Sequence, residues 1–310
     1  MKLKKLKTLQ FLEYAAVVIV AAPFYMLPHR IALRAGETIG RLLYYLLPSR
    51  RAIGLKNLQV AFGDELSDAG RKAILKTTFK NLGKTLIETL RMPKISREAL
   101  LEKVEIVGEE YCRAAKDKGR GLVYLTGHLG CWEFSSHAYS AAGYLIHTVM
   151  RPLDNPYLNE QICKRRMMFG NPLIYRGNGL RQILAALKKG ERVGILMDQN
   201  TLRSKGIFVD FFGKAACTTP VIAILALRYN VPVVPGFIIR TGFDRHKLFF
   251  GPEIEIERSG NFQKDIAVNT EKFNKIIEDV IRRYPDQWFW IHNRWKTRPP
   301  GEAAVDLLQD

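Results

Sequence analysis

The chain has 310 residues, 47% of them hydrophobic and 25% charged, which is the composition of a globular protein with a sizeable core in one large or two small domains. No repeat or low-complexity segment is present, which excludes repeat and disordered architectures. The net charge of +18 indicates an anionic partner: nucleic acid, an anionic membrane surface or an acidic protein. The four cysteines are dispersed, with no Cys-x-x-Cys pair, as is typical of reduced thiols in the cytosol.

The N-terminus combines positive charge with a long apolar segment. Four lysines among the first seven residues precede an apolar stretch from about Leu9 to Leu27. Gln10, Glu13 and Pro23 interrupt this stretch, and no convincing small-residue cleavage site of a signal peptide follows. We therefore expect an uncleaved membrane anchor that lies in or dips into the cytoplasmic leaflet. A single spanning helix, or an amphipathic helix that covers the protein's own core, is the alternative.

A second apolar stretch closes the N-terminal segment. It covers Ile39–Leu47 and ends at Arg50 and Arg51, with further arginines in the interval before it. We expect a division into two parts: residues 1–48 as a membrane-anchoring or interfacial helical segment, and residues 49–310 as one soluble catalytic domain.

From residue 50 onward, helical and strand patterns alternate. A connection over residues 50–62 is followed by a helix capped by Asp68, and the loop over 201–216 carries an aromatic cluster. The tail over 286–298 is unusually aromatic and basic. Apolar periodicity, proline starts and glycine stops predict helices over residues 68–91, 97–103, 109–118, 156–169, 180–189, 220–229 and 262–283, and another after residue 131. Short runs of β-forming residues predict strands over 104–107, 121–125, 145–150, 172–175, 193–197 and 231–240, with antiparallel additions at 248–250 and 254–256. This alternation predicts an α/β fold: a single mixed, partly parallel sheet flanked by helices.

A histidine and an acid stand where the strand over 121–125 passes into a helix. Glu133 follows His128 by five positions, which places them about 140° apart on one continuous helix, where they could not touch. They can meet if His128 lies on the turn and Glu133 in the first helical turns. The carboxylate would then fix the tautomer and leave the other ring nitrogen as a general base. A structural histidine, a metal site that includes His137, and a nucleophilic Cys131 are the competing interpretations.

Polar side chains follow several predicted strands. His128, Arg151, Arg176 and Asp198 each come directly after one, and ligands of such sheets bind outside the carboxyl ends of the strands. No Gly-x-Ser-x-Gly elbow or Walker sequence is present, so the attacked hydroxyl would belong to the substrate. A base, anion-binding arginines, apolar surface and a membrane anchor together fit the transfer of a fatty acyl group to a lipid hydroxyl.

Several motifs resemble a known family over nearly the whole chain. Four of them resemble the signature blocks of the glycerolipid and lysophospholipid acyltransferase superfamily: His128–Glu133, Ile174–Arg176, Met197–Asn200 and Val231–Pro235. Others are similar to the bacterial lipid A late (lauroyl/myristoyl) acyltransferases: Arg151–Pro156, Lys189–Glu191, Phe211–Gly213, Thr218–Pro220 and His292–Lys296.

The resemblance implies specific roles. It makes His128 the general base and Glu133 its orienting partner, with no metal and no cofactor. Arg166 and Asp198 match positions that the family needs for activity, and Arg176 matches an arginine that holds the acceptor. The substrate-binding residues implied are Arg151, Arg166, Arg176, Asp198 and Gln199.

The resemblance also implies a setting. The donor would be an acyl group on acidic acyl carrier protein or on coenzyme A, used at the cytoplasmic face of the bacterial inner membrane, with a lipid A precursor or related glycolipid as acceptor. The sequence Asp198-Gln199-Asn200 departs from the Glu-Gly-Thr type of the glycerolipid enzymes, which favours the lipid A branch. A lysophospholipid or phosphoinositide-mannoside acyltransferase is the alternative. A membrane-associated lipid hydrolase and a basic nucleic-acid-binding protein are alternatives of other classes, and the distributed cations speak against nucleic acid as a partner.

Overall fold

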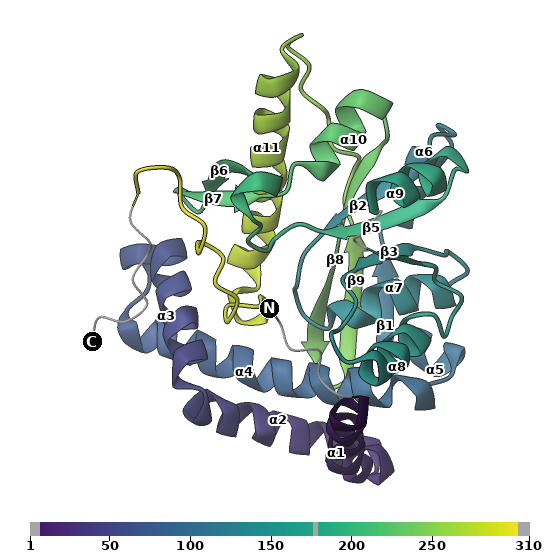
Figure 1. The fold of residues 1–310 in the computed structure, drawn as a ribbon, viewed down its shortest axis with the longest axis vertical. Coiled ribbons are helices and arrows are strands. Elements are labelled where there is room, and N and C mark those ends of the chain that lie inside the picture. Colours follow the sequence, from purple (N-terminus) through teal and green to yellow (C-terminus); the bar gives the residue numbers. More distant parts are fainter. Residues whose placement is uncertain (1–6, 176–178, 303–310) are drawn as a thin grey trace.

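The computed structural model describes residues 7–175 and 179–302, and within them a mixed, mostly parallel sheet of seven strands forms the centre of the molecule (Figure 1). Their order is β1-β9-β8-β2-β5-β3-β4. Strands β8, β2, β5, β3 and β4 run parallel to one another, whereas β9 is antiparallel to β8 and parallel to β1. The strands are β1 (Val104–Val107), β2 (Leu122–Thr126), β3 (His147–Met150), β4 (Leu173–Tyr175), β5 (Arg192–Leu196), β8 (Val233–Gly242) and β9 (Arg245–Phe250). The prediction of a mixed, partly parallel sheet is confirmed.

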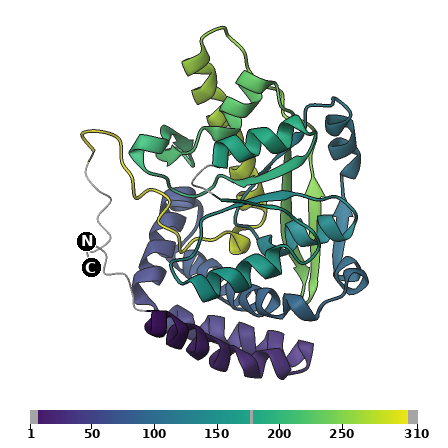
Figure 2. The same ribbon diagram turned by 45° about the vertical axis from the view of Figure 1, so that its right-hand side comes forward.

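Alternate residues of the central strands enter two different cores. Val123 and Leu125 of β2 pack into one cluster, and Leu122 and Tyr124 pack into the other, because successive side chains of a strand point to opposite faces. Helices cover these faces (Figure 2). The helices from residue 68 onward are α4 (Asp68–Arg91), α5 (Arg97–Lys103), α6 (Glu109–Lys116), α7 (Trp132–Ala141), α8 (Pro156–Arg166), α9 (Gly179–Lys188), α10 (Val221–Tyr229) and α11 (Phe262–Arg283). Short 3₁₀ turns are η1 (Gly63–Glu65), η2 (Met92–Lys94), η4 (Arg203–Lys205) and η5 (Pro285–Gln287).

Four local predictions are wrong. The expected connection over residues 50–62 is the helix α3 (Pro48–Phe62), which begins with proline in its first turn. The expected loop over 201–216 contains an antiparallel hairpin, β6 (Ile207–Phe211) and β7 (Lys214–Thr218), and its two turn residues both have positive φ, as a type I′ turn requires. The helix α4 is capped by the side chain of Ser67, not of Asp68. Residues 254–256, which were expected to add an antiparallel strand, lie outside the sheet.

The N-terminal segment folds into the helices α1 (Lys7–Met26) and α2 (His29–Leu46), which lie at the lower edge of the molecule beneath α4 (Figure 1). Helix α2 packs closely along α4: a Cβ atom on Gly83 of α4 would lie 2.0 Å from the backbone oxygen of Gly36. No residue of α1 is buried, and among the described residues it is the one helix long and apolar enough to cross a membrane. The expected division near residue 48 falls between α2 and α3.

Candidate active site

The turn after β2 carries His128 to the carboxyl edge of the parallel strands. Gly130 has a φ of 53°, and a Cβ atom there would lie 2.6 Å from the backbone oxygen of Ile238 in β8. Only glycine fits this left-handed position against a neighbouring strand. The turn therefore runs close along the sheet before α7 begins at Trp132.

The C-terminal segment after η5 holds this turn from the other side. The Gly130 amide donates to the backbone oxygen of Gln287 (3.0 Å), and the Phe289 amide donates to the backbone oxygen of His128 (3.1 Å). Leu129 and Trp288 form an isolated antiparallel bridge between these bonds. The turn that carries His128 is thus paired like a short strand with a segment about 160 positions further along the chain.

A buried carboxylate, Asp198, orients the imidazole of His128. Its Oδ1 lies 2.8 Å from Nδ1 of His128, and its Oδ2 accepts hydrogen bonds from the His128 amide (2.8 Å) and from Nε1 of Trp288 (2.8 Å). Burial alone would raise the pKa of Asp198, but the charge and hydrogen bonds of His128 outweigh burial and lower this pKa to about 2. The ionised carboxylate accepts the proton on Nδ1, which leaves Nε2 of His128 as the basic nitrogen.

The expected contact between His128 and Glu133 is wrong, because Glu133 pairs with Arg166 at the end of α8. Nε and Nη2 of Arg166 donate to the two carboxylate oxygens of Glu133, at 3.1 and 2.5 Å. Burial opposes ionisation of both groups, but the pairing keeps the pKa of Glu133 below and that of Arg166 above its ordinary value. Glu133 is thus a negative charge near His128 and not the acid on its ring.

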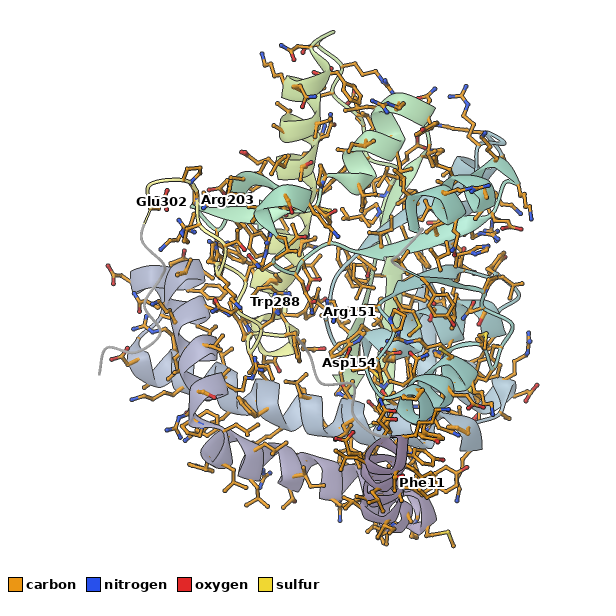
Figure 3. The ribbon with its side chains drawn as sticks, in the orientation of Figure 1. Phe11, Arg151, Asp154, Arg203, Trp288 and Glu302 are labelled. Atoms are coloured by element: carbon orange, nitrogen blue, oxygen red, sulfur yellow. The ribbon has the colours of Figure 1, made fainter. Side chains whose placement is uncertain are left out.

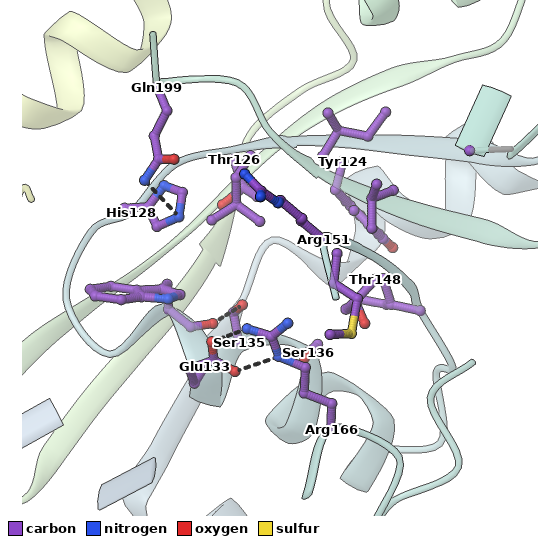
Figure 4. Close-up of a pocket in the computed structure, with 18 of the residues that line it drawn as sticks. Tyr124, Thr126, His128, Glu133, Ser135, Ser136, Thr148, Arg151, Arg166 and Gln199 are labelled. Atoms are coloured by element: carbon purple, nitrogen blue, oxygen red, sulfur yellow. Dashed lines mark hydrogen bonds and ion pairs between the residues drawn. The ribbon is translucent and has the colours of Figure 1, made fainter. Parts of the chain in front are cut away.

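Nε2, the second ring nitrogen of His128, faces a pocket of about 510 Å³ (Figure 4). The side-chain nitrogen of Gln199 lies 3.3 Å from Nε2, and the rings of Trp132 and Phe289 pack around the imidazole at centroid distances of 5.3 and 6.1 Å. Polar lining residues include Glu133, Arg166, Arg151 and Gln199, whereas Asp198 is buried behind His128 and does not line the pocket. The apolar part of the lining includes Ile146, Val149, Leu153, Ile162, Leu180, Ile183, Val221 and Phe250.

The strand-edge prediction is confirmed for the residues that the structure describes. His128 follows β2, Arg151 follows β3 and Asp198 follows β5, and the first two line the pocket directly. Arg176, predicted to follow β4, lies outside the described residues. The site thus joins a carboxylate-held imidazole, an acid–arginine pair and a partly apolar pocket of a size usual for small-molecule sites.

A sequence model of the bacterial lipid A biosynthesis acyltransferase family matches residues 2–297. The chain belongs to this family. It is 29% identical over 282 residues to the lipid A biosynthesis palmitoleoyltransferase of Escherichia coli (strain K12), which covers 90% of this chain and 89% of the relative. It is 27% identical over 284 residues to the lauroyltransferase of the same strain (89% and 88% covered), and 25% identical over 272 residues to its myristoyltransferase (88% and 83% covered). The chain is an acyltransferase of lipid A biosynthesis.

The structure of this acyltransferase speaks against two competing interpretations of the His128–Glu133 motif, a nucleophilic Cys131 and a metal site that includes His137. Cys131 is fully buried, and burial raises the pKa of its thiol well above the ordinary value, so it is no nucleophile. Both ring nitrogens of His137 lie against backbone oxygens, of Glu133 and of Arg165. Within residues 7–175 and 179–302, no group of three His, Cys, Asp or Glu side chains is placed to hold a metal ion.

Two contacts of the candidate site were not predicted from the sequence. The role of Asp198 as the partner of His128 was missed because 70 positions separate the two residues, although both follow neighbouring parallel strands. Trp288, which donates to Asp198, was not singled out. The aromatic character of the tail over 286–298 was the available signal, because a buried Trp needs a partner for its N–H group.

Proposed function

We propose that this enzyme transfers a fatty acyl group from a thioester donor, on acyl carrier protein or coenzyme A, to a hydroxyl of a lipid A precursor. The reaction would take place at the cytoplasmic face of the inner membrane. The observation that carries the proposal is the position of Nε2 of His128, which faces a partly apolar pocket while Asp198 holds Nδ1. The names of the relatives support the class of acceptor.

In the proposed mechanism, the acceptor hydroxyl takes the place of the Gln199 amide at Nε2 of His128. The imidazole removes the hydroxyl proton as the oxygen attacks the thioester carbonyl, and the positive charge that forms is stabilised by Asp198, with a smaller contribution from Glu133. The tetrahedral intermediate then expels the thiolate, which receives the proton from His128. The ester and the free thiol are the products, and no atom of the enzyme enters a covalent bond.

The two kinds of pocket lining suit the two parts of such a substrate. The apolar side chains offer a dry surface for an acyl chain, at about 0.8 kcal/mol for each CH₂ group buried. Arg151 is exposed at the edge of the pocket and would hold a phosphate or another anionic headgroup of the acceptor. The positive net charge would attract an acidic carrier protein, so added salt should weaken donor use by screening.

Mass spectrometry of the lipid product tests the proposal. Purified enzyme, an acyl thioester and a lipid A precursor should give the precursor plus one acyl group, whereas release of free fatty acid alone would show a hydrolase. The variant His128→Ala should lose about 10²–10⁴-fold in turnover, the usual contribution of a general base. His147→Ala is the matched control, because His147 pairs with Glu191 and does not line the pocket, so this variant should keep its activity. Near-normal turnover of His128→Ala would contradict the mechanism.

A further inference from the structure

Two consecutive residues contact the two ring nitrogens of His128. Asp198 holds Nδ1, and the side-chain nitrogen of the next residue, Gln199, lies 3.3 Å from Nε2 (Figure 4). Because Asp198 accepts the proton on Nδ1, Nε2 carries the lone pair, and the amide of Gln199 donates to it. An N–H donor therefore lies at the place where the proposed mechanism requires the hydroxyl of the acceptor.

The backbone on both sides of Gln199 is held in place. Asp198 before it accepts three hydrogen bonds, and the amide of Asn200 after it donates to Nε2 of His292 (3.0 Å). The side chain of Asn200 also pairs with Thr297: its Nδ2 donates to Oγ1 (3.0 Å), and its Oδ1 accepts from the amide (3.1 Å). The long, flexible side chain of Gln199 can therefore shift while its backbone stays beside His128.

The support of this loop continues away from the site. Nη2 of Arg203 donates to the backbone oxygen of Arg298 (2.7 Å), so the loop that begins with Gln199 stays beside the C-terminal segment. Figure 3 shows where the two segments lead, from Trp288 in the middle of the molecule to Arg203 and Glu302 at its left side. The position of the Gln199 backbone is thus set by long-range contacts.

Two other donors of the pocket lining already have partners. Nε and Nη2 of Arg166 donate to Glu133, and the hydroxyl of Ser135 donates to the backbone oxygen of Trp132 (2.7 Å). Among the residues that the structure describes, Gln199 is the one whose side-chain N–H group contacts Nε2 of the base. Its hydrogen bond is given up when an acceptor hydroxyl takes this position.

A donor so close to the base is also close to the second reacting group. Before reaction, the hydroxyl oxygen and the carbonyl carbon of the donor lie about 3–3.5 Å apart, so the carbonyl oxygen is within reach of an amide that the hydroxyl has displaced from Nε2. We propose that Gln199 is a catalytic residue, whose amide donates to the acyl carbonyl oxygen and stabilises the negative charge that forms on it. This inference deepens the proposed function and rests on it.

The amide acts while the carbonyl oxygen is charged. The hydroxyl oxygen bonds to the carbonyl carbon as His128 takes the hydroxyl proton, and the electron pair of the C=O double bond moves to the oxygen that Gln199 contacts. When the C–S bond breaks, this pair forms the carbonyl again, and the thiolate takes the proton from His128. The hydrogen bond from Gln199 is strongest in the charged state, so it raises turnover more than it tightens substrate binding.

The variant Gln199→Met tests the role of the amide. Methionine keeps the unbranched side chain and has no N–H donor, so turnover should fall about 10²–10³-fold with little change in KM. Gln182→Met is the matched control, because Gln182 lies on α9 and does not line the pocket. Turnover of Gln199→Met within threefold of the parent, or above it, would overturn the proposal, because the amide would then only cover Nε2 in the free enzyme.

The variant Gln199→Glu separates charge from shape. Glutamate has nearly the shape of glutamine, so a side chain that only fills space would tolerate this change better than the change to methionine. A carboxylate would instead repel the charge on the carbonyl oxygen, and we expect Gln199→Glu to be less active than Gln199→Met. The opposite order of activity would reject the role of Gln199 as a donor to the oxyanion.

Binding of analogues gives a readout that does not depend on turnover. An alkylphosphonate presents tetrahedral, anionic oxygens as the intermediate does, whereas the methyl ketone of the same chain length presents a neutral carbonyl. In calorimetry, Gln199→Met should bind the phosphonate at least tenfold more weakly than the parent enzyme and the ketone equally well. An equal change for both analogues, or no change for either, would contradict the inference.

The two proposals fail in different ways. Acyl transfer by the parent enzyme, a loss in His128→Ala and normal turnover in Gln199→Met would reject the role of Gln199 alone. Absence of acyl transfer by the parent enzyme would reject the proposed function.

Discussion

The substitution Asp198→Asn separates the orientation of His128 from the mere presence of an imidazole. Asp198 accepts three hydrogen bonds in the structure: from Nδ1 and the backbone amide of His128, and from Nε1 of Trp288. Asparagine has a single side-chain oxygen. If that oxygen keeps the two bonds at the Oδ2 position, its NH₂ group faces Nδ1 of His128, which must then accept a hydrogen bond.

The expected loss of turnover follows from the tautomer of His128. With Nδ1 as acceptor, the proton of neutral His128 moves to Nε2, and no basic nitrogen faces the pocket. The reverse orientation of the amide points two N–H donors at its NH₂ group and loses two bonds, so it does not compete. We expect turnover to fall by about 10³-fold or more, which is about 4 kcal/mol in activation free energy, with little change in KM.

The assay is a kinetic comparison of the parent enzyme, Asp198→Asn and Asp210→Asn. Asp210 is a matched control, because its carboxylate binds the Gly213 amide in the β6–β7 hairpin and does not line the pocket. Nitrogen NMR of the His128 ring should show the proton moving from Nδ1 to Nε2 in Asp198→Asn. A folded Asp198→Asn enzyme that keeps turnover within threefold of the parent would refute the proposed role of Asp198.

Three further predictions concern other parts of the pocket and its surroundings. Arg166→Ala leaves the carboxylate of Glu133 without its bidentate partner and should lower the free energy of unfolding by about 2 kcal/mol, measured by urea denaturation. The added change Glu133→Gln should restore most of this stability, and no restoration would contradict the pairing. Burial lowers the pKa of His292 from 6.5 to about 4, so the unfolded chain binds the proton at a higher pH than the folded chain does. The free energy of unfolding therefore falls as the pH falls, by about 2 kcal/mol between neutral pH and about pH 5. His292→Gln, which can still accept from the Asn200 amide, should lose this part of the pH dependence in urea titrations, and an unchanged dependence would assign it to other groups. Gly194 lines the pocket beside Tyr124 and Thr148, with room for a Cβ atom. The side chain of Gly194→Val would shorten the space for the acyl chain, so turnover of the longest accepted acyl donor should fall more than tenfold and turnover of short donors should change little. An equal loss with all donors would place the acyl chain elsewhere.

The strand edge was predictable because it depends on local patterns. Short β-forming runs that end in polar residues identified the positions of His128, Arg151 and Asp198, and parallel pairing then brings such strand ends to one side of the sheet. The regular periodicity of α4 and α11 likewise gave their bounds, Asp68–Arg91 and Phe262–Arg283, as predicted.

The acid that binds the ring of His128 could not be predicted from local sequence patterns. A spacing of five positions allows a contact between His128 and Glu133 only for some paths of the turn, and the path is set by Gly130 against β8 and by the C-terminal segment. Those contacts join residues far apart in sequence. The pattern could therefore show that an acid stands near the imidazole, but not which acid binds its ring.

The hairpin was missed for a related reason. The turn at Phe212 and Gly213 needs positive φ at both residues, and phenylalanine seldom adopts this conformation. The Phe212 amide is held by Glu278 of α11 (2.7 Å), and its ring packs on Phe62 of α3. Tertiary contacts thus supply what the local sequence does not favour, so the β-turn signal was absent from the sequence.

The two acids of the site differ in what surrounds them, and this difference assigns their tasks. Asp198 has all its hydrogen bonds on the side of the protein, from a backbone amide, an indole and the ring it orients, so nothing in the pocket competes for it. Glu133 lines the pocket and forms an ion pair with Arg166, which lies on α8. The N-cap residue of α8, Asn155, holds α1, and the last residue of the helix, Arg166, holds Glu133. A single helix of 11 residues therefore connects α1 to the acid near His128.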